Sequence, residues 1–318
     1  RSITGLNIAP DVVWIKKRSG TGNHSLADTV RGATKNLVPN DTNSESTEPN
    51  YVTAFNSDGF SLGTSSIINN NGDTYVSWNW DAGTSTESNT DGSITSSVRA
   101  NQTAGLSIVT WTRSGGSNTA TIGHGLNAVP ELIILKDRDT STNWYVGSPY
   151  IDPSRGDFLS CLNLNLSTAR FNNSDVFTQG GAPSSSVFGV GAVGNPSGDN
   201  LAYCFAPVEG YSAFGSYTGN ANADGPFVYT GFRPKWVLIR CSSVVQNWVI
   251  IDAERNTYNI VNNGLYADLT NAEQTSNRAD FTSNGFKIRT NSGELNTNSG
   301  THLYAAFAEH PFKTARAR

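Results

Sequence analysis

The sequence is poor in the residues that disulfide-linked, metal-bound and membrane proteins use. It has no methionine, four histidines and three cysteines in 318 residues. Cys161, Cys204 and Cys241 cannot all pair within one chain, and none lies in a CxxC or His-spaced pattern typical of zinc sites. No apolar run approaches the roughly 20 residues of a membrane helix, and the N-terminus has no signal-peptide pattern. We therefore expect no structural disulfide, no metal, no cofactor and no membrane insertion.

Charge is also scarce. Charged residues make up 15% of the chain, the formal net charge is −4, and Lys and Arg are scattered rather than clustered. Nucleic-acid binding needs a basic patch that can displace counterions from phosphates, so no nucleic-acid partner is predicted. An initiator methionine is poorly removed before a bulky residue such as Arg1. We therefore expect the sequence to be part of a longer chain.

The dominant positive feature is a repeat. "GLNIAPDVVWIKKR" at residues 5–18 is echoed by "GLNAVPELIILKDR" at 125–138 and by "GFRPKWVLIRCS" at 231–242. Each copy has a glycine turn, a proline (Pro10, Pro130 or Pro234) and an apolar run, which ends in a cation. A near-continuous apolar run of this length is typical of a central strand that is covered on both faces.

Three later markers recur in the same order. An Asp-x-x-Arg pattern follows each run, then a Gly-containing phenylalanine segment, then a Gly-led aromatic strand. The members are Asp28 and Arg31, Asp152 and Arg155, Asp252 and Arg255; Phe60, Phe188 and Phe286; and Trp78, Phe205 and Phe307. Four markers in one order indicate a module of about 100 residues, an ordinary size for one domain.

Each module is predicted to be all-β. Module 2 contains eight short runs rich in β-branched and aromatic residues, separated by turn residues: 107–112, 120–123, 131–136, 143–148, 158–165, 176–179, 186–191 and 201–206. This pattern favours three tandem antiparallel β-sandwich modules, jelly-roll-like. A three-bladed propeller is the alternative. We expect helix at most as a short turn within residues 39–50 or 270–280.

The expected boundaries are residues 1–83 for module 1, 84–104 for a polar linker, 105–210 for module 2 and 211–318 for module 3. Modules 2 and 3 carry an additional strand and turn before the glycine turn, at 107–116 and 215–225, whereas module 1 has only residues 1–4 there. Module 1 should therefore have an open sheet edge with unpaired N–H and C=O groups. Upstream residues or another subunit would have to cover this edge.

The Asp-x-x-Arg pattern favours a structural turn over a ligand site. In "DPSRG" at residues 152–156 an aspartate opens a type I turn and proline follows it, a good turn sequence. We expect the carboxylates of Asp28, Asp152 and Asp252 to bond backbone N–H groups or the Arg31, Arg155 and Arg255 side chains. A ligand-binding role stays open as the alternative.

No catalytic pattern is found. There is no Gly-x-Ser-x-Gly elbow, no carboxylate pair on apolar ground and no supported Ser–His or Cys–His pair. His24, His124, His302 and His310 lie at non-equivalent positions of the modules. "DRDTSTN" at residues 137–143 begins like a calcium loop but lacks the central glycine and the final glutamate. The sequence predicts neither an enzyme nor a metal site.

Two Asn-Trp pairs are the candidate ligand-binding residues. Asn143–Trp144 and Asn247–Trp248 precede the Asp-x-x-Arg pattern in modules 2 and 3. A tryptophan ring stacks on the C–H face of a sugar while neighbouring amides and carboxylates meet its hydroxyls. These pairs are the predicted contact with glycan, and burial in the core is the alternative for each tryptophan.

Several long phrases resemble a known family. "DTVRGATK", "SDGFSLG", "NNNGDTYVSWNWDAG", "ATIGHGLNAVPELIILKDRD" and "YAAFAEHPFKTARAR" are similar to an uncharacterised repeat domain of structural and predicted tail-fibre proteins of tailed, especially marine, bacteriophages. The resemblance implies a virion protein on the particle surface that contacts other virion proteins. It also implies a homotrimer, although three modules in one chain could imitate that symmetry.

Three functions follow from these observations. The first is a tail fibre or receptor-binding adhesin that contacts host-surface glycan, which the polar loops and the missing catalytic patterns favour. The second is a purely structural capsid-surface or tail decoration protein. The third is a polysaccharide hydrolase, for which the sequence offers no acid/base pair.

Overall fold

The central strand of each module is covered on both faces in the computed structural model, which describes residues 1–114, 119–177 and 182–308. These strands are β2 (Val12–Lys17), β13 (Leu132–Asp137) and β21 (Pro234–Cys241). Successive side chains of a strand point to opposite faces. Val12 and Trp14 therefore enter a core shared by all modules, whereas Val13 and Ile15 enter a core of module 1 alone. The expected double coverage is confirmed.

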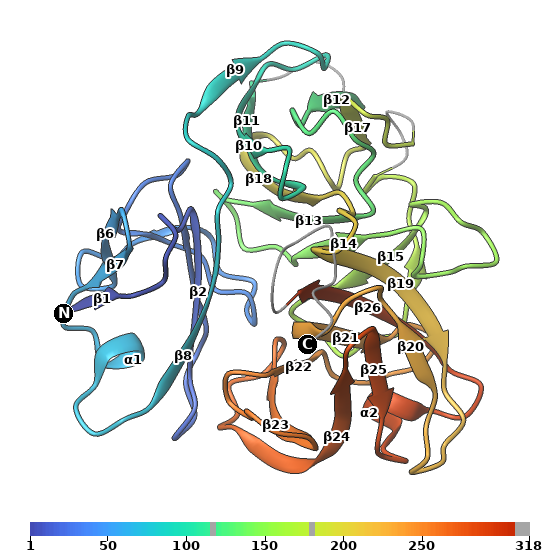
Figure 1. The fold of residues 1–318 in the computed structure, drawn as a ribbon. Coiled ribbons are helices and arrows are strands. Elements are labelled where there is room, and N and C mark those ends of the chain that lie inside the picture. Colours follow the sequence, from blue (N-terminus) through green and yellow to red (C-terminus); the bar gives the residue numbers. More distant parts are fainter. Residues whose placement is uncertain (115–118, 178–181, 309–318) are drawn as a thin grey trace.

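The shared core joins the three thirds of the chain. Figure 1 shows the strands in three groups, coloured blue, teal to yellow, and orange to red, around a common centre. Aromatic rings fill this centre with edge-to-face contacts. The Trp80 ring lies 5.6 Å from Trp236 and 5.9 Å from Phe307, and Trp14 lies 5.7 Å from Trp78, measured between ring centroids. Such contacts add to the burial of large apolar surfaces.

Module 1 consists of short antiparallel sheets on either side of its own core. The strand orders are β3-β2-β8, β1-β7-β6 and β4-β5. Its further elements are β1 (Ser2–Thr4), β3 (Ser25–Asp28), β4 (Lys35–Asn36), β5 (Ser46–Thr47), β6 (Val52–Asn56), β7 (Gly59–Leu62), α1 (Ser66–Asn69) and β8 (Tyr75–Trp80).

Module 2 pairs an eight-stranded sheet with the two-stranded sheet β12-β17. The order of the large sheet is β16-β15-β14-β13-β18-β11-β10-β9. Its further elements are β9 (Glu87–Asn89), β10 (Ser96–Asn101), β11 (Leu106–Arg113), β12 (Ala120–Gly123), β14 (Tyr145–Gly147), β15 (Ser160–Asn163), β16 (Phe171–Asn172), β17 (Val187–Val190) and β18 (Gly198–Phe205).

Module 3 is one eight-stranded antiparallel sheet in the order β19-β26-β21-β22-β23-β24-β25-β20. An eight-stranded sheet also excludes the four-stranded blades of a propeller. Its further elements are β19 (Ser212–Thr218), β20 (Phe227–Tyr229), β22 (Val249–Asp252), β23 (Val261–Tyr266), β24 (Gln274–Thr282), β25 (Gly285–Ile288), α2 (Gly293–Asn296) and β26 (Thr301–Ala308).

Two predictions about local structure are wrong. The helices α1 and α2 lie outside the two loops that were expected to hold a helical turn, and those loops contain β5 and the start of β24. Both described helices are four residues long, so neither could span a membrane. Of the strands predicted for module 2, the run at 176–179 fails. Val176 and Phe177 are buried in a turn, and residues 178–179 lie outside the described chain.

The segment 84–104 is not only a linker. It contains β9 and β10, and β10 pairs with β11 over five residue pairs, from Ser97 opposite Thr110 to Asn101 opposite Leu106. The polar composition of residues 84–104 was interpreted as a linker, but an edge hairpin needs apolar residues on only one face. Val98 supplies it, buried in the core of module 2.

The strand register also corrects one equivalence between modules. Phe205 lies opposite Leu132 and Phe307 lies opposite Trp236, and the corresponding residue opposite Val12 is Trp80. Trp78, matched to these phenylalanines from sequence, occupies the position of Tyr203 instead. The aromatic strand of module 1 is thus displaced by two residues from the sequence match, which leaves the same face inward because strand side chains alternate with period two.

The shared core predicts a large effect of one substitution. Trp80→Ala should lower the free energy of unfolding by about 3–5 kcal/mol, the cost of removing a buried aromatic ring and leaving a cavity. Chemical denaturation monitored by circular dichroism would measure it. Trp80→Phe, which keeps a ring against Trp236 and Phe307, is the control and should cost clearly less. A loss of stability by Trp80→Ala no larger than that of the control would contradict the packing described.

Candidate functional site

The three modules are joined in a ring by equivalent seams, the lines along which one module's loop lies against the next module's central strand. At each seam a loop N–H donates to a main-chain carbonyl at the end of that strand. The donor–acceptor pairs are Glu45 to Arg138 (2.7 Å), Arg170 to Ser242 (2.7 Å) and Glu273 to Arg18 (2.9 Å). Module 1 thus bonds to module 2, module 2 to module 3, and module 3 back to module 1.

A buried cation lies at each seam. Lys16, Lys136 and Arg240 continue the inward-facing alternation of β2, β13 and β21, and all three are buried. Each donates to a carbonyl of its own module and to one of the neighbouring module. The acceptors in the neighbouring modules are the main-chain oxygens of Thr270 for Lys16, Thr42 for Lys136 and Thr168 for Arg240.

Burial lowers the pKa of these cations. The pKa of Lys16 falls to about 8, first because burial disfavours its charge and second because Lys17 is nearby. Burial likewise lowers the pKa of Lys136 to about 8 and that of Arg240 to about 10. The carbonyls that surround each cation replace part of its lost hydration, so the cation fixes the position of the neighbouring loop.

The predicted ligand-binding tryptophans belong to the seams. Trp144 and Trp248 are 0% and 1% exposed, and their indole N–H groups donate to the carbonyls of Val38 (3.0 Å) and Asn163 (2.8 Å) in the preceding module. The prediction that these rings stack on glycan is therefore wrong, since no solvent reaches them. Their buried N–H groups instead need protein acceptors.

Of the two asparagines of the predicted site, Asn143 takes part in this hydrogen bonding and Asn247 lies next to the buried Trp248. The Asn143 side-chain oxygen accepts a bond from the Asn165 amide (2.9 Å), and Asn165 in turn accepts from the Trp144 main-chain N–H (2.9 Å). Asn247 is half-buried next to Trp248, whose main-chain N–H donates to the Asp268 carboxylate. None of these four residues forms an open binding surface.

In module 1 the position of these tryptophans is held by His24. Its main-chain N–H donates to Asn40, as those of Trp144 and Trp248 donate to Asn165 and Asp268. Trp14 donates to Nδ1 of His24 (2.8 Å), so the ring proton is on Nε2, which donates to the carbonyl of Tyr266 in module 3 (2.9 Å). Burial, and then the charge of Lys16, lower the pKa of His24 to about 3. The imidazole is therefore neutral and structural.

In modules 1 and 3 the Asp-x-x-Arg pattern forms a salt bridge within a turn. Arg31 Nε donates to Asp28 (2.6 Å) and Arg255 Nε donates to Asp252 (2.7 Å). Each carboxylate also accepts a bond from a neighbouring module, Asp28 from the Tyr203 hydroxyl (2.7 Å) and Asp252 from the Trp78 indole (3.0 Å). Both aspartates are buried, which leaves no carboxylate for a ligand there.

A glutamate connects each of these arginines across the seam. Glu45 contacts Arg31 of its own module (3.2 Å) and accepts bonds from Nε and Nη2 of Arg138 in module 2 (2.9 and 3.0 Å). Glu273 is placed in the same way, between Arg255 (2.8 Å) and Arg18 (2.8 Å). Although burial opposes it, the bond from Arg138 and the charge of Arg31 hold the pKa of Glu45 below its ordinary value.

Module 2 departs from this arrangement. Arg170 stands where the other modules have the bridging glutamate, and Ser242 stands where they have the partner arginine. Arg170 approaches Asp152 (3.4 Å), whose side chain also accepts from Ser154 (2.6 Å). Arg155 does not bond Asp152 through its side chain, and pairs with Asp157 at the surface (3.0 Å). The charged contact of Arg170 therefore lies within module 2, and across this seam the Ser242 hydroxyl donates to the carbonyl of Ile151 (2.7 Å).

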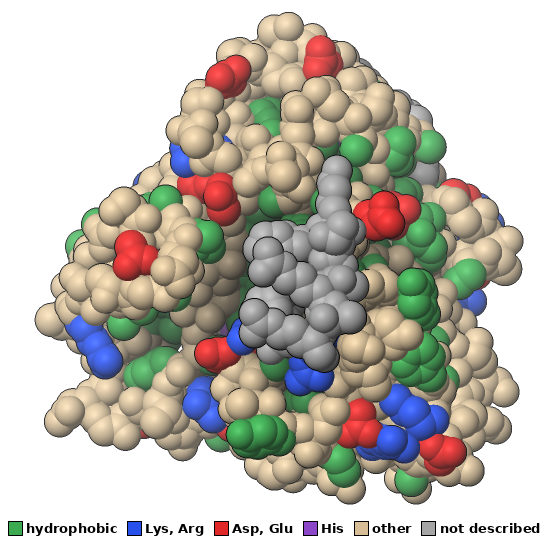
Figure 2. Space-filling model, in the orientation of Figure 1, with side chains coloured by type: hydrophobic (Ala, Val, Ile, Leu, Met, Phe, Trp, Pro, Cys, Tyr) green, Lys and Arg blue, Asp and Glu red, His purple; other side chains and the backbone are tan. Residues whose placement is uncertain are grey.

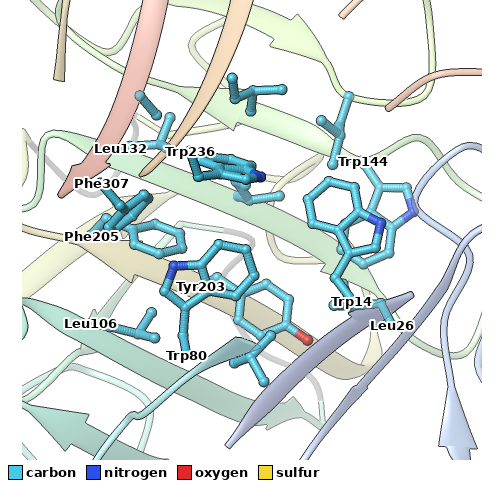
Figure 3. A pocket seen from close by; sticks show the side chains of 15 residues that line it. Trp14, Leu26, Trp80, Leu106, Leu132, Trp144, Tyr203, Phe205, Trp236 and Phe307 are labelled. Carbon is cyan, nitrogen blue, oxygen red and sulfur yellow. The ribbon is translucent and has the colours of Figure 1, made fainter. Parts of the chain in front are cut away.

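The hollow at the ring centre is part of the core. It is lined only by apolar and aromatic side chains of all three modules, including Trp14, Trp80, Trp236 and Phe307. Figure 3 shows the rings turned toward one another and the Tyr203 hydroxyl turned away from the hollow. Ligand sites add a few polar groups that orient the ligand. None lines this hollow, so we assign it to imperfect packing.

The His302 imidazole and the Cys161 thiol are also buried. Burial lowers the pKa of His302 to about 4 and raises that of the Cys161 thiol to about 12. His310 lies outside the described residues. Within the described chain no three His, Cys, Asp or Glu side chains form a group that could hold a metal ion. Residues 137–143 form a turn in which Asp137 accepts main-chain N–H bonds from Asp139 and Thr140.

Exposed aromatic residues were missed by the sequence analysis. Tyr258 and Tyr229 of module 3 are 84% and 67% exposed. Tyr258 lies in the turn after the Asp-x-x-Arg pattern, where the corresponding Phe158 of module 2 is buried. Comparing the modules position by position in this turn would have singled out a residue that differs between them, but only the structure shows which of the two is exposed.

The glutamate bridge leads to a prediction. Glu45→Gln should lower the free energy of unfolding by about 3 kcal/mol, because Arg31 and Arg138 lose a shared buried anion. Urea denaturation at neutral pH would measure the loss. Glu254→Gln removes the same charge from an exposed pair with Lys235 and should change stability little. Equal effects of the two variants would contradict the role assigned to Glu45.

His24 predicts a pH dependence. Its pKa is about 3 in the folded chain and about 6.5 when unfolded. Between these values only the unfolded chain takes up the proton, so stability should decrease as pH falls from about 6.5 to 3. Between pH 7 and pH 4 the decrease should be on the order of 3 kcal/mol. His24→Gln keeps a donor and an acceptor without titrating. Unfolding free energies at pH 7 and pH 4 should therefore differ less in this variant, and equal differences would refute the assignment.

Comparison with known proteins gives one match. A family described as a domain of unknown function (DUF7483) matches residues 1–311. No curated protein and no solved structure matches the chain. Because the family match spans nearly the whole sequence, seams and shared core included, this chain belongs to the DUF7483 family.

Proposed function

We propose that this chain is a non-enzymatic bacteriophage virion protein, a tail fibre or receptor-binding adhesin whose loops contact glycan on the host surface. The resemblance of its repeated phrases to phage structural proteins supports the virion assignment. A binding function is further supported because Lys16, Lys136 and Arg240, three buried cations of the described chain, serve the seams. Fold alone does not specify function, so the exposed residues carry the rest of the proposal.

The surface favours neutral polar partners. Figure 2 shows acidic and basic side chains interspersed on this face, with hydrophobic side chains in small separate groups. A mixed surface of low net charge provides little electrostatic attraction for nucleic acid or for charged lipid. Neutral or weakly charged polysaccharide is a suitable partner, since hydroxyl groups and C–H faces are recognised by amides and aromatic rings.

The observation that carries the glycan assignment is the pair of exposed tyrosines in module 3. Tyr229 ends β20 and lies opposite Gly285 of β25. Tyr258 adjoins Asn259, which exchanges two bonds of 2.9 Å with the main chain of Phe281 on β24. The two tyrosines therefore flank the hairpin that connects β24 to β25. Tyr229 lies on the sheet and Tyr258 in a turn bonded to it, and tyrosine rings at such positions can stack on sugar with little loss of conformational entropy.

A purely structural role is the second candidate. It is favoured by the open edge of β8, described below, because an unpaired edge strand is a surface for assembly. In that case the tyrosines would contact another virion protein. The expected homotrimer is not required for a closed core, since the three modules of one chain already form a ring. It stays a prediction.

The tyrosines provide the test. Tyr229→Ser with Tyr258→Ser should reduce glycan-array binding of the isolated chain, and adsorption of phage that carry the variant, at least tenfold. Val245→Ser is the matched control, because Val245 is 65% exposed in the turn before β22 and away from the hairpin. Thermal unfolding would check that each variant folds. Unchanged glycan binding and adsorption of the folded double variant would exclude this surface as the receptor contact.

A further inference from the structure

The outer edge of β8 lacks the neighbour that its equivalents have. β18 pairs with β11 and β26 pairs with β19, whereas no described strand pairs with the outer edge of β8. β1 does not fill this role, because it pairs with β7 as β12 pairs with β17 and β20 with β25. Module 1 is therefore missing one strand of the sheet that both other modules complete.

The main-chain groups at this edge can be identified. Arg18 N–H donates to the carbonyl of Thr74 (2.8 Å), which fixes the antiparallel alternation along β2 and β8. The main-chain N–H and C=O groups of Val76, Trp78 and Trp80 therefore bond to β2, whereas those of Ser77 and Asn79 point away from β2 toward the open edge. Their equivalents in β18, Ala202 and Cys204, lie opposite Val109 and Ser107 of β11.

A groove runs along this edge and contains polar atoms without partners. It lies between β8 and Tyr211, Lys235, Trp236 and Phe307 of module 3. Within the described chain the Asn79 side-chain oxygen and the Trp236 indole nitrogen are buried and have no hydrogen-bond partner. The Asn79 amide instead bonds the outward carbonyl of Ser77 (3.3 Å). Buried polar atoms left unpaired are costly, and here two of them lie beside one groove.

We propose that β8 is a strand acceptor, which binds one further antiparallel strand contributed from outside residues 1–318. The strand is an extended, neutral segment with the pattern of β11, in which Leu106 and Ile108 face the shared core and Val109 and Trp111 face the module's own core. It places main-chain groups opposite Ser77 and Asn79 and fills the groove against Trp236 and Phe307, as strand addition does elsewhere.

A second copy of this chain does not fit the same edge. Tyr211 and Lys235 of module 3 line the groove beside β8. If the β8 edges of two copies paired, each copy's module 3 would lie in the way of the other copy. A single strand fits, because β11 lies in the equivalent place between β18 and module 1. There Arg99 of the adjacent β10 contacts Asp11 of module 1 (2.7 Å).

A labelled peptide with the neutral sequence of residues 105–112 is the probe. It should bind the 318-residue chain saturably in fluorescence anisotropy, and hydrogen exchange should slow at the Ser77 and Asn79 amides on binding. N-methylation of the peptide at the Val109 position, whose N–H faces β8, should weaken binding at least tenfold. N-methylation at the Ile108 position, whose N–H faces away, is the matched control and should have little effect.

A variant of the chain completes the test. Asn79→Pro removes an outward N–H and should weaken binding at least tenfold while the chain stays folded, since proline is tolerated at a sheet edge. Equal binding of the two methylated peptides, equal binding by Asn79→Pro, or no binding at all would overturn the acceptor. A chain that sediments as a dimer, and that Asn79→Pro makes monomeric, would show that a second copy occupies the edge and would overturn the external strand.

Discussion

Each module buries polar groups whose hydrogen-bond partners belong to the preceding module of the ring. Lys136 needs the carbonyl of Thr42, Trp144 that of Val38, and Arg138 the carboxylate of Glu45. A module on its own would leave these groups either hydrated or unpaired, and unpaired buried polar groups cost several kcal/mol. The ring is therefore the smallest unit that satisfies all three modules, and the shared aromatic core follows from its closure.

Side chains of different charge and type occupy equivalent positions at the three seams. The bridging position is glutamate in modules 1 and 3 and Arg170 in module 2, where the arginine that a glutamate would bind is replaced by Ser242. The position of Trp144 is likewise taken by His24, which keeps an N–H donor toward the carbonyl of Tyr266. All three seams share the main-chain bond and its direction, whereas the side chains at the equivalent positions differ.

The β8 edge fits the same pattern. Modules 2 and 3 complete their central sheets with β11 and β19, and these strands also cover the side of the shared core. Module 1 lacks such a strand among the described residues, so the unpaired Trp236 indole and the groove occur at the seam that it shares with module 3. The ring is thus closed by side chains at all seams but completed by a strand at only two of them.

The repeat and most of its strands could be predicted from the sequence, because alternation, turn residues and proline act locally. The double coverage of β2, β13 and β21 and the turns at Asp28 and Asp252 could be predicted for that reason. Exposure could not, because it depends on which surfaces meet. Trp144 was predicted to bind a ligand but is buried in a seam. Tyr258 was not among the predicted binding residues but is exposed, and residues 84–104 were predicted to be a linker but form an edge hairpin. Only the tertiary structure placed three modules so that each supplies the partners of the next, since bonds between residues far apart in sequence leave no local pattern.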